Sequence, residues 1–167
     1  EGDFEMTISV GDTLPDATLL RVGENGPEQV QMADKLKGRK VVIFGLPGAF
    51  TRTCTAAHMP SFIRTKDGFD AKGVDEVICV AVNDPFVMDA WGEQTGGTAA
   101  GITLLGDAAS EFTKAIGLTL TAPPVGFYDR SQRYALYAED GVVKVLNVEE
   151  GPGVCDVSAG ETLLQAI

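Results

Sequence analysis

Cysteine and histidine are scarce in this sequence. The chain of 167 residues has three cysteines, Cys54, Cys79 and Cys155, and a single histidine, His58. Three widely spaced cysteines cannot form the dense disulfide framework of a small secreted domain, and a chain of this length does not need one. The sequence has no Cys-x-x-Cys pair, so the ligand spacing of a structural zinc site is missing. We therefore expect no bound metal and a reducing compartment.

Basic residues and long apolar runs are also scarce. Lys and Arg number 13 against 24 Asp and Glu, which gives a formal net charge of −11 and a pI near 4.4. This balance opposes binding to nucleic acid phosphates and to anionic lipid surfaces. The longest apolar runs, such as residues 77–82, are far shorter than the roughly 20 residues that a membrane-spanning helix needs. We predict a soluble protein without nucleic acid or membrane partners.

The composition is that of one ordinary globular domain. Hydrophobic residues make up 44% of the chain and charged residues 22%, which is typical of soluble globular proteins and not of disordered chains. We expect a single domain over residues 1–167. The first residues have neither the basic nor the apolar region of a secretory signal, so Met6 is a candidate initiator with residues 1–5 added ahead of it. A cytoplasmic location is expected.

Apolar runs alternate with segments of helical spacing. Short runs rich in β-branched residues predict strands at residues 41–44, 77–82, 102–105, 134–138 and 142–148, the last two as a hairpin. Helical spacing predicts helices at residues 53–64, 85–94, 110–116 and 158–167. This alternation indicates an α/β fold, with a central mixed β-sheet covered by helices on both faces.

One segment of the chain is suited to thiol chemistry. It leaves a predicted buried strand, turns at Pro47, and places Cys54 in the first turn of a predicted helix, with the hydroxyls of Thr51 and Thr53 nearby. Unpaired N–H groups at a helix start favour an anion, so a cysteine there ionises more readily than a free thiol. The alternative is that Cys54 is a small buried apolar residue, which is common for unpaired cysteines.

The residues of this segment resemble a known family. Pro47, Thr51 and Cys54 reproduce the Pro-x-x-x-Thr-x-x-Cys motif of the peroxiredoxins. The wider Gly-x-Pro-Gly-Ala-Phe-Thr context, with His58 and Pro60 downstream, is similar to the subfamily that comprises the plant type II and animal type-five enzymes. Further similar blocks lie at residues 11–15, 82–88, 133–136 and 140–147. Several blocks in the right order are far more specific than a lone motif.

This resemblance implies a thioredoxin-like fold and a thiol-dependent peroxidase that needs no metal or organic cofactor. Cys54, as the peroxidatic thiolate, would attack the terminal oxygen of hydrogen peroxide or a small alkyl hydroperoxide and become a sulfenic acid. The family roles would make Thr51 a hydrogen-bond partner of sulfur and peroxide, Pro47 a shield against water, and Arg133 the stabilising guanidinium. The backbone N–H groups of Thr53 and Cys54 would bind the peroxide oxygens.

Some positions near this motif have other interpretations. Taken alone, Arg133 is typical of a solvated surface arginine in a charged patch with Arg130. Arg52 stands where many relatives have proline, and its charge would aid ionisation of Cys54. His58 lies four residues after Cys54, but the family's chemistry uses no histidine base, so we expect a packing or hydrogen-bonding role for it.

The other two cysteines leave the regeneration step open. Cys79 matches the second cysteine of the plant type II enzymes, but it lies in an apolar strand and would need local unfolding to reach Cys54. Cys155 lies in a glycine-rich loop, near but not at the resolving position of the animal type-five enzymes. The third route, which we favour, is attack on the sulfenic acid by an external thiol, from glutathione with glutaredoxin or from thioredoxin.

The resemblance also implies a homodimer that forms through loops beside the active site. Phe50, Phe86 and Trp91 are candidates for that contact, and core packing explains them equally well. Two other functions stay open at this point. One is a thiol–disulfide oxidoreductase on the same fold, which the lack of Cys-x-x-Cys disfavours. The other is a redox sensor or holdase, in which oxidation of Cys54 changes partner binding.

Overall fold

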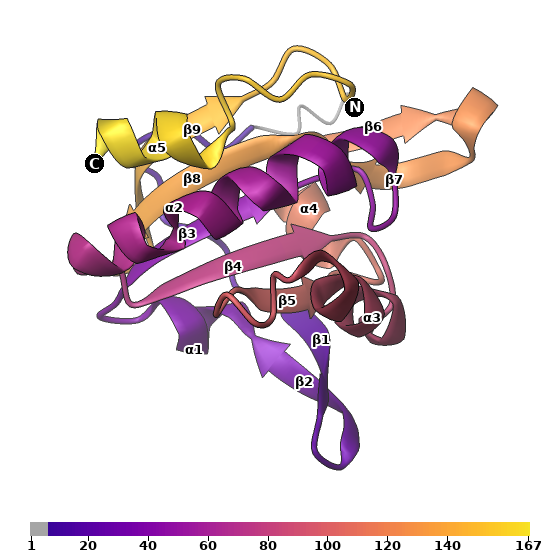
Figure 1. The fold of residues 1–167 in the computed structure, drawn as a ribbon, viewed down its shortest axis with the longest axis horizontal. Helices are drawn as coiled ribbons and strands as arrows, with labels where there is room; N and C mark the ends of the chain where they lie inside the picture. The colour runs from indigo at the N-terminus through magenta and orange to yellow at the C-terminus, as the bar shows by residue number, and fades with distance from the viewer. Residues whose placement is uncertain (1–6) are drawn as a thin grey trace, which may run out of the picture.

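A seven-stranded mixed sheet organises the chain in the computed structural model, which describes residues 7–167 (Figure 1). Its strands are β1 (Thr18–Gly23), β2 (Gly26–Gln31), β3 (Lys40–Gly45), β4 (Glu76–Ala81), β5 (Thr103–Gly106), β8 (Tyr134–Glu139) and β9 (Val142–Val148). They hydrogen-bond in the order β2-β1-β5-β4-β3-β8-β9. A separate antiparallel hairpin consists of β6 (Thr119–Ala122) and β7 (Phe127–Ser131). The interpretation of Met6 and residues 1–5 lies outside the described residues.

The central strands are buried on both sides. β3 and β4 are parallel, as are β4 and β5, whereas β8 is antiparallel to both β3 and β9. In β3, Val42 and Phe44 belong to one core cluster, and Val41 and Ile43 belong to the other. This division arises because successive side chains of a strand point to opposite faces. Residues 41–44 therefore form the doubly covered strand that their apolar run predicts.

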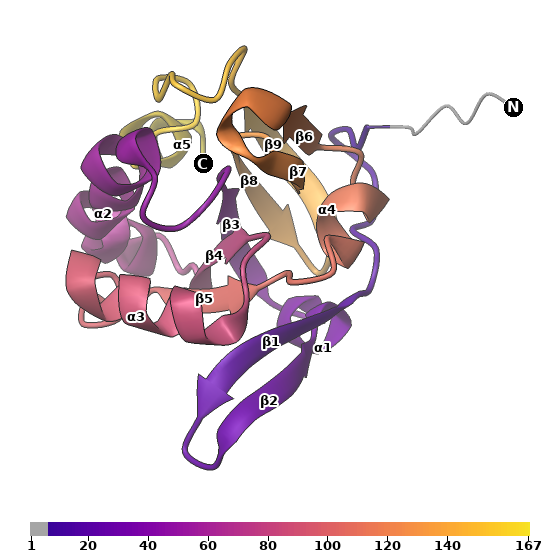
Figure 2. The same cartoon turned by 90° about the vertical axis from the view of Figure 1, so that its right-hand side faces the viewer.

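Helices pack on both faces of the sheet (Figure 2). They are α1 (Met32–Leu36), α2 (Met59–Ala71), α3 (Pro85–Thr95), α4 (Glu111–Ala115) and α5 (Gly160–Ala166), with a π-helical turn η1 (Cys54–His58) and a 3-10 turn η2 (Pro123–Val125). Phe62 of α2, Trp91 of α3 and Leu163 of α5 join the core cluster on one face. Met32 of α1 and Phe112 of α4 join the cluster on the other. The predicted α/β class with a central mixed sheet is confirmed.

The sequence prediction missed two hairpins and one short helix: β1–β2, β6–β7 and α1. The β2 segment, Gly-Pro-Glu-Gln-Val-Gln, is an edge strand without a buried side chain, so it has no apolar run to reveal it. Proline within a strand is itself typical of sheet edges, because proline cannot donate to a ladder. The strands of both hairpins bury few side chains, so apolar periodicity does not predict them.

The structure refines two expectations, one about a helix and one about the aromatic residues. The helix predicted over residues 53–64 is a π-helical turn followed by α2, which continues to Ala71. Trp91 is fully buried, so it belongs to the core and is not available as a dimer contact. Phe50 and Phe86 are 50% and 61% exposed, and thus remain candidates. Among residues 7–167, no helix is both long enough and apolar enough to cross a membrane.

Candidate active site

Cys54 is the first residue of the π-helical turn, which follows β3 after a short loop. The N–H of Thr55 donates to the carbonyl oxygen of Thr51 at 3.0 Å. The N–H groups of Thr53 and Cys54 precede that donor in the chain, so they belong to the unpaired donors of a helix start. The N–H of Met59 donates to the carbonyl oxygen of Cys54 and closes the wider turn. The prediction that Cys54 lies at the start of a helix is confirmed, and the structure shows that this first part of the helix is a π-helical turn.

The loop before Cys54 is tied to two other parts of the chain. Arg130 of β7 donates from Nη1 to the carbonyl oxygen of Pro47 at 3.0 Å. Asn83, which follows β4, accepts through Oδ1 from the N–H of Ala49 at 2.9 Å. These hydrogen bonds hold the Pro47 turn in one place, because they come from segments that the sheet and the hairpin position independently.

The threonine hydroxyls beside Cys54 donate to carbonyl oxygens. Thr51 Oγ1 donates to the carbonyl oxygen of Gly48 at 2.6 Å, and Thr53 Oγ1 donates to that of Gly153 at 3.4 Å. A hydroxyl has one hydrogen and two lone pairs. In this state Thr51 therefore has lone pairs left to accept a hydrogen bond, while its hydrogen is engaged by Gly48.

Arg133 contacts the candidate nucleophile directly. Its Nη2 donates to Cys54 Sγ at 3.2 Å. Nη2 and Nε also donate to the carbonyl oxygen of Pro152, at 2.8 and 3.2 Å. Arg133 is only 2% exposed and Cys54 is fully buried. The interpretation of Arg133 as a solvated surface residue is therefore wrong, and the interpretation of Cys54 as a merely apolar residue does not account for a guanidinium at its sulfur.

His58 bonds to the same guanidinium. Its Nδ1 lies 3.0 Å from Nη1 of Arg133, and its Nε2 lies 3.0 Å from the carbonyl oxygen of Ser158. Burial, reinforced by the charge of Arg133, lowers the pKa of His58 to about 3. The ring is thus neutral near pH 7 but only weakly basic, and both of its nitrogens are engaged by Arg133 and Ser158, so it does not take the proton of Cys54. The predicted hydrogen-bonding role of His58 is confirmed.

Glu149 organises the loop that carries Pro152 and Cys155. Its Oε2 accepts from the N–H of Asp156 at 2.6 Å and from the N–H and Oγ of Ser158 at 2.8 and 2.7 Å. Burial opposes ionisation of this carboxyl, but the hydrogen bonds from Ser158 and Asp156 outweigh it and lower its pKa. Sequence reasoning missed Glu149, because an acidic residue before a glycine-rich loop is typical of a solvated surface.

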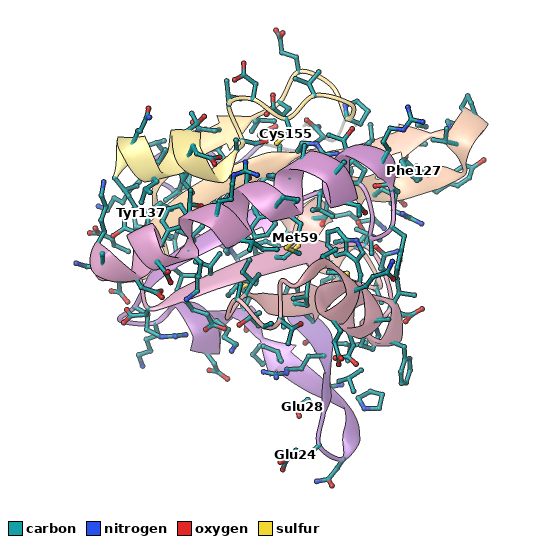
Figure 3. All side chains as sticks on the ribbon, in the orientation of Figure 1. Glu24, Glu28, Met59, Phe127, Tyr137 and Cys155 are labelled. Atoms are coloured by element: carbon teal, nitrogen blue, oxygen red, sulfur yellow. The ribbon has the colours of Figure 1, made fainter. Side chains whose placement is uncertain are left out.

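The two remaining cysteines lie in different environments. Cys79 is fully buried within β4, paired with Phe44 and Leu104 on the neighbouring strands. Burial raises the pKa of its thiol well above the ordinary value. Cys155 is partly exposed in the loop between β9 and α5 (Figure 3), and burial raises the pKa of its thiol as well. All three cysteines are free thiols. Within residues 7–167, no group of three potential metal ligands is present.

Comparisons with known proteins place this geometry in a family. The chain matches the Redoxin family over residues 9–164. It is 48% identical to Peroxiredoxin-2E-2, chloroplastic, of Oryza sativa subsp. japonica over 165 residues, which cover 96% of this chain and 73% of the relative. Reduced Prx3 of Vibrio vulnificus, solved in complex with H2O2, has 45% identity and a TM-score of 0.89, with 96% of this chain and 99% of that chain covered.

A second solved structure gives the same result at lower identity. Peroxiredoxin 5 from Alvinella pompejana is 31% identical, with a TM-score of 0.82, and the match covers 95% of this chain and 97% of that chain. The predicted thioredoxin-like fold and the resemblance to the plant type II and animal type-five enzymes are confirmed. The chain belongs to the Redoxin family, and within it to the peroxiredoxins, the thiol-dependent peroxidases.

Proposed function

We propose that Cys54 is the peroxidatic nucleophile of this peroxidase. The observation that carries the proposal is the buried guanidinium of Arg133, whose Nη2 lies 3.2 Å from Cys54 Sγ. A permanent positive charge in a buried site favours the thiolate, which is the reactive form of cysteine. The same charge stabilises negative charge that develops on the leaving oxygen. The complex of the Vibrio vulnificus Prx3 with H2O2 supports hydrogen peroxide as a substrate, with small alkyl hydroperoxides as the related class.

The chemical step is a displacement at oxygen. The thiolate attacks the terminal oxygen of the hydroperoxide, an S–O bond forms and the O–O bond breaks. The sulfur loses two electrons and becomes a sulfenic acid, which keeps the hydrogen of the attacked oxygen. The other oxygen gains the two electrons, takes a proton and leaves as water or an alcohol.

The neighbouring groups have distinct roles in this proposal. The N–H groups of Thr53 and Cys54 bind the peroxide oxygens, because they start the helix and lack intrahelical partners. The Thr51 oxygen accepts a hydrogen bond from the peroxide, since its own hydrogen is engaged by Gly48. Pro47 turns the loop and keeps water from the sulfur. Arg133 stabilises both the thiolate and the leaving oxygen.

Substitution of the sulfur tests the assignment. Cys54→Ser is expected to abolish peroxide consumption when either thioredoxin or glutaredoxin with glutathione is supplied. Cys79→Ser is the matched control, because it changes a cysteine of equal burial that takes no part in the cycle when an external thiol reduces the sulfenic acid. Turnover that survives in Cys54→Ser would assign the chemistry to another residue. A loss in Cys79→Ser as large as that in Cys54→Ser would show that the effect is not specific to this sulfur.

We further propose that an external thiol reduces the sulfenic acid. Cys79 lies in the centre of the sheet, so a disulfide with Cys54 would require β4 to unfold locally. Cys155 is partly exposed, but hydrogen bonds to Glu149 and from Arg133 hold its loop. Mass spectrometry after one equivalent of peroxide separates the routes. We expect a mixed disulfide of Cys54 with added glutathione, and an intramolecular disulfide that Cys155→Ser or Cys79→Ser removes would contradict this.

The assembly and location of the protein are also proposals. Phe50 and Phe86 are large apolar side chains exposed on the segments next to the active site, and such residues favour an interface between two copies. We expect a homodimer in sedimentation experiments, and a monomeric Phe86→Lys variant.

Three free thiols suit a reducing compartment, and we propose the cytoplasm. The rice relative is named chloroplastic, so fractionation that finds the protein in an organelle would overturn that location.

A further inference from the structure

The Arg133 guanidinium is held by three neighbours, and His58 is one of them. Nη1 donates to Nδ1 of His58 at 3.0 Å. Nε and Nη2 donate to the carbonyl oxygen of Pro152, and Nη2 also donates to Cys54 Sγ. A guanidinium presents its donors in a rigid planar fork, so a hydrogen bond at Nη1 restricts the direction of Nη2. The hydrogen bond with His58 therefore affects the direction in which Nη2 of Arg133 points toward Cys54 Sγ.

The partners of His58 define which nitrogen carries the hydrogen. The carbonyl oxygen of Ser158, 3.0 Å from Nε2, can only accept, so Nε2–H donates to it and Nδ1 presents a lone pair to Arg133. Burial and the charge of Arg133 keep the pKa of His58 at about 3. The ring thus remains an acceptor at neutral pH. A protonated ring would direct an N–H at another N–H and lose the contact.

The ring itself is fixed from several directions. Phe44 and Phe62 contact it edge-on, with ring centroids 5.2 and 5.6 Å from that of His58. Ser158, which orients Nε2, is held in turn by Glu149 through its N–H and its hydroxyl. The acceptor that faces Arg133 is therefore preorganised by packing and by a second layer of hydrogen bonds.

The π-helical turn brings the two contacts together. Cys54 is the first residue of this turn and His58 the last, and both bond to the one guanidinium. The turn therefore holds Arg133 at two points, through the sulfur at Nη2 and the imidazole at Nη1. Wider turns of this kind are frequent at functional sites.

We propose that His58 is a positioning residue for the peroxidase reaction, which accepts the Nη1–H of Arg133 and thereby keeps Nη2 directed at Cys54 Sγ. Its role in turnover rests on the proposed function of Cys54. Its effect on the sulfur does not, because the reactivity of a thiol is measurable without any peroxide. The other charged group near the guanidinium is Glu149, which the test leaves unchanged.

The test measures alkylation of Cys54 by iodoacetamide as a function of pH, with the Cys54 peptide of the full chain followed by mass spectrometry. His58→Leu removes the acceptor, and a hydrogen bond to a charged group is worth about tenfold or more in an equilibrium. We expect about tenfold slower alkylation at pH 7 and a profile displaced to higher pH. His58→Asn restores an acceptor, since its Oδ1 replaces Nδ1, and is expected to stay within about threefold of the wild type. Equal losses in both variants would overturn the proposal.

A double-mutant cycle asks whether His58 acts through Arg133. In an Arg133→Gln background, His58→Leu is expected to change the alkylation rate less than about twofold, because the group that it positions is gone. Additive losses would overturn the proposal.

Nitrogen NMR of the wild-type ring needs no variant to fold. It should show a neutral Nε2–H tautomer from pH 8 to pH 5, and a charged ring or an Nδ1–H tautomer would also overturn the proposal.

Failure of this proposal is distinguishable from failure of the proposed function. If Cys54→Ser still consumes peroxide while the alkylation cycle is non-additive, the nucleophile assignment fails and His58 still positions Arg133. If Cys54→Ser is inactive while the cycle is additive, the nucleophile assignment stands and the role of His58 is wrong.

Discussion

Trp91 Nε1 donates a hydrogen bond to Oγ1 of Thr55 at 3.0 Å, which ties α3 to the residue after Cys54. The indole is fully buried and lies in the core cluster that contains Cys54. This aromatic residue therefore supports the π-helical turn in two ways, through its apolar packing and through a specific hydrogen bond.

Trp91→Phe should destabilise the protein through this site. The substitution removes the hydrogen bond to Thr55 and part of the buried ring, and we expect a loss of about 1–3 kcal/mol in the free energy of unfolding. Urea denaturation measures it. Val125→Ala is the control, because Val125 is 65% exposed and such a surface change stays within about 0.5 kcal/mol. Equal stability of Trp91→Phe and wild type would mean that the indole contact contributes nothing.

Arg133 should not be replaceable by lysine. Its guanidinium contacts Cys54, His58 and Pro152 at once, whereas an ammonium is a single point of charge. We expect Arg133→Gln to lower the second-order rate with hydrogen peroxide by about 10²–10³-fold, as for the loss of one oxyanion donor. Arg133→Lys is expected to recover only part of that loss. Rapid-mixing kinetics provide the measurement. A lysine variant as fast as the wild type would show that the planar guanidinium is not required.

Gly48 should be required for the approach of Arg130. A Cβ at Gly48 would lie 2.5 Å from Nη1 of Arg130, the atom that donates to the Pro47 carbonyl oxygen. Because the long side chain can move aside, we expect Gly48→Ala to lose this hydrogen bond while keeping its fold. The rate with peroxide should fall about threefold to tenfold, in keeping with the loss of one ordinary hydrogen bond that acts on the loop and not on the sulfur directly.

Two further variants check this interpretation of Gly48. Gly151→Ala is the matched control, because a Cβ there meets nothing within 4 Å. Arg130→Ala should reproduce the Gly48→Ala loss, and the combined variant should lose no more than either alone. A combined loss that equals the product of the two would show that Gly48 acts independently of Arg130.

Stability should fall between pH 7 and pH 5 because of His58. The pKa of His58 drops from 6.5 in the unfolded chain to about 3 in the folded protein. Between these two values the imidazole is protonated in the unfolded state and neutral in the folded state. Stability is therefore lost as the pH falls, by about 2 kcal/mol over this interval. Since His58 is the only histidine, urea denaturation of His58→Asn should show a flatter dependence. A wild-type curve as flat as that of the variant would exclude a buried neutral ring.

Local patterns were enough to predict the centre of the fold. Residues 41–44 and 77–82 are apolar runs too short for helices, and the structure places them in adjacent buried strands. Pro47, Thr51 and Cys54 lie within eight residues of one another, so the motif and the helix start that follows could be predicted together. These features depend on the side-chain period and on the conformational preferences of neighbouring residues, both of which are present in the chain before it folds.

The arrangement of the charged groups required the three-dimensional structure. Arg130 and Arg133 look alike in the sequence, yet one donates to the Pro47 loop and the other is buried against Cys54. The bond from Arg133 to His58 spans 75 positions, and that from His58 to Ser158 spans 100. Such contacts depend on how loops close between packed strands and helices. No local pattern contains that information. A charged side chain is well solvated in water, and it can be buried only where residues distant in the sequence supply its hydrogen-bond partners.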